Sequence, residues 1–269
     1  MIGNKYFKEK SISGLIIILC LLPFIPLVIT AIGFDYRWPS VFPDEFTIRG
    51  IEYVFLDNIG TYQGIITTVV IAVSVIIIDL LLGVPAAMAL ERYEFSGKRL
   101  CKVILFAPII VPPFTAIMGL YAVFIKLSLT ETVIGVIIAH ILPTLPYMIR
   151  ALMIPFSTMN SELEDQARIL GANGFKRFYY IVLPHLLPGI FAGSILVFLI
   201  SASQYFLTLL VGGGIVTTLP ITMIPFINGG DKLIGSVYSI LFSLVALISI
   251  WLLDLILRRY YKTKNFKVI

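Results

Sequence analysis

The feature that most constrains this chain is a set of six apolar runs, each long enough to cross a lipid bilayer. A helix needs about 20 predominantly apolar residues to span roughly 30 Å of hydrocarbon. Because a backbone in lipid must satisfy its own hydrogen bonds, and because these runs are longer than barrel strands, we expect all of them to be helices. The predicted spans are residues 12–34, 64–90, 103–125, 132–154, 182–210 and 234–257.

The composition also indicates a membrane protein. Of the 269 residues, 59% are hydrophobic and 13% are charged, whereas a soluble domain has about 45–50% apolar and roughly 25% charged residues. So little charge cannot cover a soluble surface, which excludes a cytosolic enzyme, a disordered chain and a small secreted scaffold. The net charge of +5 is then best explained by basic cytoplasmic loops, and we expect no nucleic-acid partner.

The distribution of Lys and Arg predicts the orientation of the spans. Sixteen of the 20 basic residues lie in the N-terminal tail, in the segments after the second and fourth spans, and in the C-terminal tail. The three remaining segments contain four. Because basic residues concentrate in cytoplasmic segments, we expect a multi-pass protein with both termini in the cytoplasm.

The cytoplasmic loop over residues 157–181 is longer than most connections and contains signals for a short helix. Ser161 is a good N-cap, and Glu164 stands three residues later, as in a capping box. Glu164 and Arg168 are spaced for an i,i+4 ion pair. Gly171 can adopt the left-handed conformation that ends a helix. These residues predict a helix that begins at Ser161 and ends before Gly171.

This short helix would have a narrow apolar stripe of Leu163, Ala167 and Leu170. An isolated helix of about ten residues is marginal in water, so another surface should pack against it. Periodicity alone leaves two alternatives open. The stripe can rest on the chain itself or on lipid headgroups, or it can bind another protein.

The same loop resembles the cytoplasmic motif of ABC importer permeases, which reads Glu-Ala-Ala, three residues, Gly, nine residues, Ile-x-Leu-Pro. Asp165 and Gln166 depart from the motif, although Asp keeps the charge and Gln is a good helix former. Residues 58–93 are similar to the second helix of these permeases. The positions that match the motif are Ala167, Gly171, Ile181, Leu183 and Pro184, and Leu170 and Ala172 beside it also look like the family.

The resemblance implies a fold and a role. The chain would be a single all-α domain, residues 1–269, with the kinked six-helix fold of a type I ABC importer permease. It would be one of two transmembrane subunits in a bacterial plasma (inner) membrane and would form half of the translocation pathway. The short helix would couple it to a cytoplasmic ATPase. The coupling residues would be Ser161, Leu163, Glu164, Asp165, Ala167, Arg168, Leu170, Gly171 and Ala172, with Ile181, Leu183 and Pro184 closing the motif.

The same resemblance implies several partners. These are a second permease subunit of a different sequence, two cytoplasmic ATPase subunits, an extracellular or periplasmic substrate-binding protein, and membrane lipid. ATP and Mg²⁺ would bind the ATPase, so this chain would be non-catalytic and without a cofactor or metal of its own. Ser96-Gly97-Lys98-Arg99 is not a phosphate loop, because the upstream Gly is missing and Arg99 occupies the Ser/Thr position.

Four polar residues in the spans are candidates for the translocation path. Asp79 lies in the middle of the second run, where a charged Asp costs about 2.5–3.5 kcal/mol. It can line a cavity that passes a cation, or it can form a structural hydrogen bond at a helix or subunit interface. We expect Ser203 and Gln204 to line the path, because the resemblance implies that the fifth helix borders it, and we add Tyr121 of the third run. Apolar spacing alone leaves hydrogen bonds between helices as the alternative.

The substrate is predicted only as a small polar solute. The last third of the chain looks more like permeases for polyamines, ferric iron, thiamine or phosphonates than like those for oligosaccharides. An anionic Asp79 would suit a cation, which favours a polyamine such as spermidine or putrescine. A stand-alone secondary transporter is the remote alternative, but the chain has no convincing internal repeat.

Overall fold

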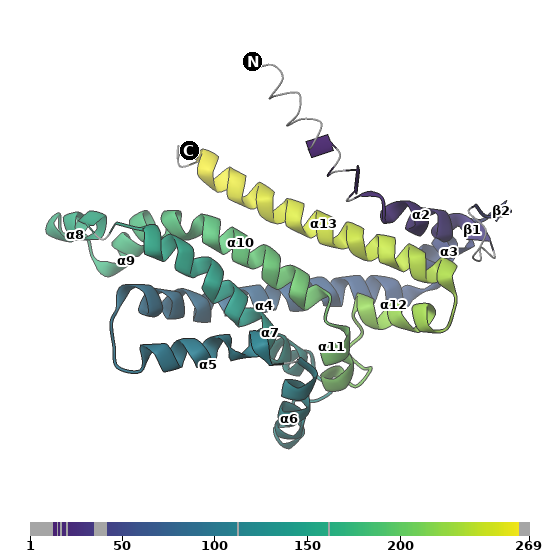
Figure 1. Ribbon diagram of the computed structural model, residues 1–269, viewed down its shortest axis with the longest axis horizontal. Coiled ribbons are helices and arrows are strands. Elements are labelled where there is room, and N and C mark those ends of the chain that lie inside the picture. Colours follow the sequence, from purple (N-terminus) through teal and green to yellow (C-terminus); the bar gives the residue numbers. More distant parts are fainter. Residues whose placement is uncertain are drawn as a thin grey trace, which may run out of the picture. The chain divides into compact units, whose positions relative to one another are not determined.

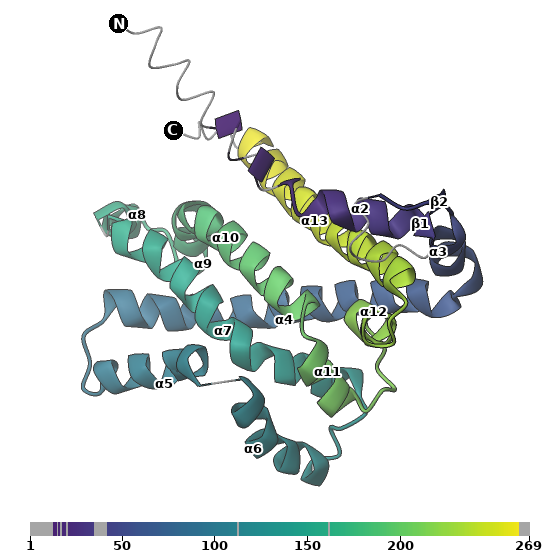
Figure 2. The same ribbon diagram turned by 45° about the vertical axis from the view of Figure 1, so that its right-hand side comes forward.

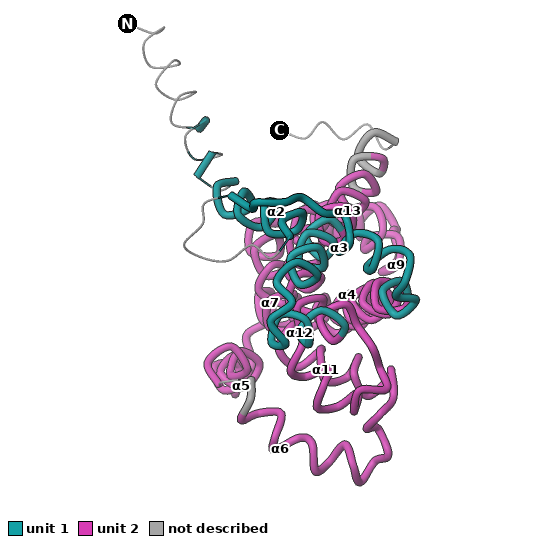
Figure 3. The backbone as a smooth tube through the Cα atoms, turned by 90° about the vertical axis from the view of Figure 1, so that its right-hand side faces the viewer, with its two compact units in different colours: residues 1–62, 222–244 teal, residues 63–221, 245–269 magenta. Residues whose placement is uncertain are grey.

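A computed structural model of the chain describes residues 13–14, 16, 18–19, 21–34, 42–111, 113–160 and 162–263. These residues are almost entirely helical (Figure 1). The chain divides into two compact units, coloured separately in Figure 3. Unit 1 comprises residues 1–62 and 222–244, and unit 2 comprises residues 63–221 and 245–269.

Unit 1 is held together by aromatic and polar contacts. The hydroxyl of Tyr238, a fully buried residue, accepts a hydrogen bond from Asn58 Nδ2 (2.9 Å) and shares another with Thr61 (2.8 Å). Its ring stacks on Phe226, with ring centroids 5.5 Å apart. The short elements of this unit are α2 (Phe24–Ile32), antiparallel β1 (Gly33–Phe34) and β2 (Glu45–Phe46), α3 (Arg49–Glu52) and the π-helix η1 (Tyr53–Asp57).

Four helical stretches are long and apolar enough to cross a membrane, and the bent pair α5–α6 would add a fifth if it is one span. They correspond to the predicted runs at 64–90, 132–154 and 234–257 and to the first part of 182–210. Of the predicted run at 12–34, residues 12, 15, 17 and 20 lie outside the described residues, and the described part contains α2, whose 9 residues are too few to cross a membrane. The long helices are α4 (Ile59–Arg92), α7 (Val133–Thr158), α10 (Leu183–Ala202) with α9 (Gly174–Arg177) and the π-helix η2 (Phe178–Val182) before it, and α13 (Lys232–Thr263).

The predicted span over residues 103–125 is not one continuous helix. The chain forms α5 (Lys98–Ile110) and α6 (Pro113–Lys126), which are bent by more than 40° relative to each other. Figures 1 and 2 both show α6 turning away from α5. Val111, which precedes a proline in the sequence, has an extended backbone (ψ 127°), as sterics before proline favour. Pro113 lacks the N–H that would continue the helical ladder.

The prediction of one helix over residues 182–210 is wrong. α10 ends at Ala202, and α11 (Tyr205–Gly212) begins after a break at Ser203 and Gln204. Two side-chain hydroxyls donate hydrogen bonds to backbone carbonyls near this break. Ser203 Oγ donates to the Ile200 carbonyl, and Thr208 Oγ1 donates to the Gln204 carbonyl. Such bonds compete with the helical ladder. α12 (Leu219–Asn228) follows.

Within unit 2, α7 and α10 run side by side in very close contact (Figures 1 and 2). Two glycines of α10 permit this approach. A Cβ on Gly189 would lie 2.7 Å from the backbone oxygen of Ala151, and one on Gly193 would lie 2.6 Å from the sulfur of Met148. The spacing Gly-x-x-x-Gly is typical of packed membrane helices. α4 approaches the same part of α7 through Gly83.

Candidate functional site: the coupling surface

The short helix predicted in the loop over residues 157–181 is present as α8 (Glu162–Ile169). Asn160 Oδ1 accepts a hydrogen bond from the backbone N–H of Glu162 (2.9 Å) at its start. Ser161, the predicted N-cap, lies outside the described residues, and so does its half of the predicted capping box. At the other end Gly171 has φ +81°, and its left-handed conformation confirms the predicted helix terminus.

The two backbone bonds that end α8 form a Schellman motif. The N–H of Gly171 donates to the carbonyl of Arg168 (3.0 Å), and the N–H of Ala172 donates to the carbonyl of Ala167 (2.9 Å). Such a terminus satisfies the last carbonyls and reverses the chain sharply. The chain then enters α9, where Asn173 Oδ1 accepts from the N–H of Lys176 (2.9 Å).

One edge of α8 is attached to the ends of two long helices. Glu164 Oε1 lies 2.6 Å from Nη1 of Arg92, the last residue of α4. The same guanidinium lies over the ring of Phe156 on α7, with its carbon 5.1 Å from the ring centroid. Its Nη2 donates to the sulfur of Met159 (3.1 Å). The predicted pairing of Glu164 with Arg168 is wrong, because Arg92 reaches Glu164 from another helix.

The rest of α8 is open. Arg168 lies 3.8 Å from Asp165 instead, and both side chains are more than 60% exposed. Leu170, at its C-terminal end, is 86% exposed. We call the exposed apolar face of this region the coupling surface, and it comprises Leu163, Ile169, Leu170, Phe175 and Tyr180.

The remaining motif residues lie where the loop turns back into the long helix. Ile181 is in η2, and Leu183 and Pro184 open α10. All three are half-buried, as is Ala172. Proline fits the first turn of a helix, where its missing N–H has no intrahelical partner. The end of the motif therefore begins α10.

The end of α4, the start of α5 and α8 lie together at one end of unit 2. The charge distribution predicts that all three are on the same side of the membrane. Besides the Arg92–Glu164 pair, Lys102 near the start of α5 lies 3.8 Å from Glu91. Lys98 Nζ donates to Glu94 (2.7 Å), and this bond and charge hold the pKa of the Glu94 carboxyl below its usual range. The gathering agrees with the predicted alternation; the cytoplasmic identity of this end stays a prediction.

The four predicted path residues are not brought together. Asp79 is fully buried within unit 2, and its carboxylate oxygens have no hydrogen-bond partner among the described residues. The neighbouring Thr144 hydroxyl donates to the carbonyl of His140 instead (2.8 Å). Tyr121 is half-buried on α6, whereas Ser203 is exposed at the helix break. Gln204, also at the break, is half-buried.

A buried histidine, His140, joins the two sides of that break. The His140 ring lies 2.9 Å from Ser201 Oγ on α10 and 3.0 Å from Thr208 Oγ1 on α11. Because Thr208 donates its own proton to Gln204, it accepts from Nε2, and Nδ1 accepts from Ser201. In the sequence, Ser201 and Thr208 flank Ser203 and Gln204 within an apolar run, and this cluster of polar residues is the signal that could have predicted the network.

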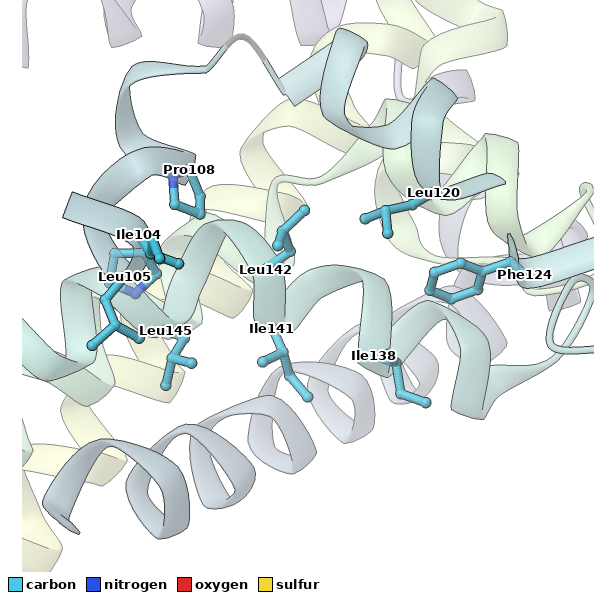
Figure 4. Close-up of a pocket in the computed structure, with 10 residues that line it drawn as sticks. Ile104, Leu105, Pro108, Leu120, Phe124, Ile138, Ile141, Leu142 and Leu145 are labelled. Carbon is cyan, nitrogen blue, oxygen red and sulfur yellow. The ribbon is translucent and has the colours of Figure 1, made fainter. Parts of the chain in front are cut away.

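The groove in Figure 4 lies between α5, α6 and α7 and has a volume of about 320 Å³. Every side chain that lines it is apolar, so it offers no hydrogen bond to a polar solute. None of the four predicted path residues lines it. The ten lining residues are Ile104, Leu105, Pro108, Leu120, Phe124, Ile138, Ile141, Leu142, Leu145 and Pro146.

These features define a helical, multi-pass membrane protein with an exposed loop helix. The sequence profile of the binding-protein-dependent transport system inner membrane component family matches residues 79–262. The chain belongs to this family, the ABC importer permeases, which are non-catalytic membrane subunits.

Relatives in this family are named for several different substrates. The diacetylchitobiose uptake system permease protein NgcG of Streptomyces coelicolor is 31% identical over 170 residues, which cover 63% of this chain and 56% of that protein. The molybdate/tungstate transport system permease protein WtpB of Pyrococcus abyssi is 33% identical over 46% of this chain and 50% of that protein. The putative 2-aminoethylphosphonate permease protein PhnV of Salmonella typhi is 22% identical over 94% of this chain and 97% of that protein.

A solved structure shares the fold. A chain of a bacterial ABC transporter involved in the import of the acidic polysaccharide alginate superposes with a TM-score of 0.66. The superposition covers 96% of this chain and 98% of that chain at 16% sequence identity. The likeness shows the fold of an ABC importer permease.

Proposed function

We propose that this chain forms half of the translocation pathway of an ATP-driven importer and that its coupling surface docks on a cytoplasmic ATPase. The exposure of α8 carries this proposal. A helix of eight residues is marginal in water, yet Leu170 and Ile169 are 86% and 85% exposed within the chain. Large apolar side chains gathered on such a helix are typical of a surface that a partner covers.

The other proposed partners are a second permease subunit, a second ATPase subunit and a substrate-binding protein on the outer side. The buried position of Asp79 and the apolar groove of Figure 4 support the need for a second permease. Neither offers a polar path through this chain alone. ATP-driven closure of the ATPases would move α8 and with it the spanning helices, as a rigid-body switch.

Co-purification tests this function. The full-length permease, expressed in its native host and extracted in detergent, should comigrate with a soluble ATPase that hydrolyses ATP in the eluate. Leu170→Glu should abolish comigration, since it places a charge on the proposed interface, and charged replacements at Ala167 and Gly171 should act likewise. Ile215→Glu changes an apolar side chain of similar exposure (63%) in the turn after α11 and should not.

Two results would contradict this function. One is a wild-type permease that binds no ATPase. The other is substrate uptake into proteoliposomes driven by an ion gradient without any ATPase, which would favour the secondary transporter.

For the substrate we propose a small polar solute. The preference for a polyamine depended on Asp79 facing a cavity, and its full burial in the chain weakens that argument. The relatives are named for a disaccharide, for oxyanions and for 2-aminoethylphosphonate. Isothermal titration of the cognate binding protein with spermidine, putrescine, ferric iron, thiamine, 2-aminoethylphosphonate and molybdate would separate these classes.

A further inference from the structure

We propose that Arg92 is the positioning residue that fixes α8 to the cytoplasmic ends of α4 and α7, so that the helix and the spans move as one body. This inference rests on the proposed function, because it explains how movement of α8 would reach the membrane. It concerns a residue outside the loop motif. Arg92 lies at the end of α4, more than sixty residues before α8 in the sequence.

The contacts of Arg92 differ from those of an ordinary surface cation. Its guanidinium has three partners from two segments: the Glu164 carboxylate, the Met159 sulfur and the Phe156 ring. Phe156 is 3% exposed and is therefore a rigid platform in the packed part of α7. A planar guanidinium can stack on a ring and bind a carboxylate at the same time through a rigid set of donors, a geometry that the compact ammonium of lysine reproduces only in part.

The Arg92–Glu164 pair also differs from the other ion pairs between described residues. At 2.6 Å it is the shortest, and both side chains are less than 20% exposed. The Asp165–Arg168 pair on the same helix has an N–O distance of 3.8 Å, and its side chains are 63% and 69% exposed. Exposed pairs contribute little, whereas a shielded pair resists screening by solvent and salt.

α8 has little else to hold it. None of its residues is buried, and its remaining recorded side-chain bonds join neighbours within the loop, such as Asn160 with Glu162. The Arg92–Glu164 pair is thus its one side-chain ion pair to another helix among the described residues. A helix that is exposed over most of its surface and attached to the spans through one ion pair can transmit a movement only if that attachment is stiff.

The distance between two spin labels measures directly how rigidly α8 is attached to α4. Labels are placed at Glu162→Cys on α8 and at Leu81→Cys, an exposed position on α4, after both native cysteines are replaced by serine. The full-length permease in lipid nanodiscs is measured as wild type and as Arg92→Ala, Arg92→Lys and Glu164→Gln. The matched control is Lys98→Ala, which removes a pair of similar length (2.7 Å) near the same helix end.

The expected result is a narrow distance distribution in the wild type and in Lys98→Ala. Its width should at least double in Arg92→Ala and Glu164→Gln, and Arg92→Lys should lie between. The distance distribution of the doubly exchanged Arg92→Glu/Glu164→Arg protein should be narrower than that of Arg92→Glu alone or of Glu164→Arg alone. An unchanged width in Arg92→Ala would overturn the proposal, and a double exchange that stays broad would overturn the ion pair as the cause.

The complex with the ATPase supplies the second measurement. With ATP and vanadate, the wild-type distance should equal that of the resting complex, because α8 and α4 move together; a shifted distance would overturn the one-body movement. Failure of the proposed function is distinguishable from this. It would appear as a wild-type permease without an ATPase, while the width measured on the permease alone would still decide the role of Arg92.

Discussion

The contact between α7 and α10 allows a sharp test of whether the glycines of α10 are required by close packing. The two positions would place a new methyl group against different neighbours. At Gly189 the nearest atoms are the Ala151 backbone oxygen at 2.7 Å and the Pro155 ring at 2.8 Å, neither of which can rotate away. At Gly193 the nearest atom is the Met148 sulfur at 2.6 Å, the end of a flexible side chain.

The free energies follow from these neighbours. Replacing Gly by Ala inside a helix stabilises it by roughly 0.8–1.0 kcal/mol, and overpacking costs about 1–3 kcal/mol. Gly189→Ala should therefore destabilise the protein by up to about 2 kcal/mol. Gly193→Ala should be near neutral, because Met148 can adopt another rotamer. Gly119→Ala, on α6 with no atom within 4 Å of the new Cβ, is the matched control and should stabilise the protein slightly.

The assay is thermal unfolding of the full-length permease in detergent, followed by the loss of monodisperse protein. A difference of about 2 kcal/mol corresponds to about 4–8 °C in midpoint for a chain of this size. From the highest to the lowest midpoint, the expected order is Gly119→Ala, Gly193→Ala and Gly189→Ala. Equal midpoints for Gly189→Ala and Gly193→Ala would refute the reasoning, because only the first meets a backbone atom and a proline ring.

Two further predictions concern buried polar groups. His140→Leu should lower the thermal midpoint, since it removes two hydrogen bonds worth about 0.6 kcal/mol each in membrane proteins, and His140→Asn, which can keep one of them, should lie between Leu and the wild type; equal midpoints would contradict a bridging role. Asp79→Asn should leave the rate and substrate preference of uptake into proteoliposomes unchanged and should not lower stability, because the structure buries this carboxylate without a hydrogen-bond partner among the described residues. A changed substrate preference would instead assign Asp79 to the path.

Local signals predicted the parts of the site that depend on neighbours in sequence. The left-handed Gly171 and the end of α8 follow from the preference of a single residue, and the structure shows both. The spans at 64–90, 132–154 and 234–257 follow from apolar length alone. Gly189 and Gly193, four residues apart in an apolar run, are an equally local signal of close helix packing.

The errors arose where a side chain had to choose between a near and a distant partner. Glu164 has Arg168 at the favoured i,i+4 spacing, but Arg92 offers a shielded contact with further support from Phe156, and the shielded contact prevails. The break in the fifth run has the same origin. Hydropathy averages over Ser203 and Gln204, whereas their region is shaped by hydroxyls that bond to backbone carbonyls.

These two errors have a common physical consequence for the proposed mechanism. A coupling helix with only internal ion pairs would not be attached to the spanning helices and could rotate relative to them. A continuous fifth helix would have no break at which its two parts could move relative to each other. With Glu164 committed to Arg92, α8 is mounted on α4, while Asp165 and Arg168 stay exposed for a partner. The tertiary contacts that the sequence pattern failed to predict are therefore the ones that would convert a marginal surface helix into a lever.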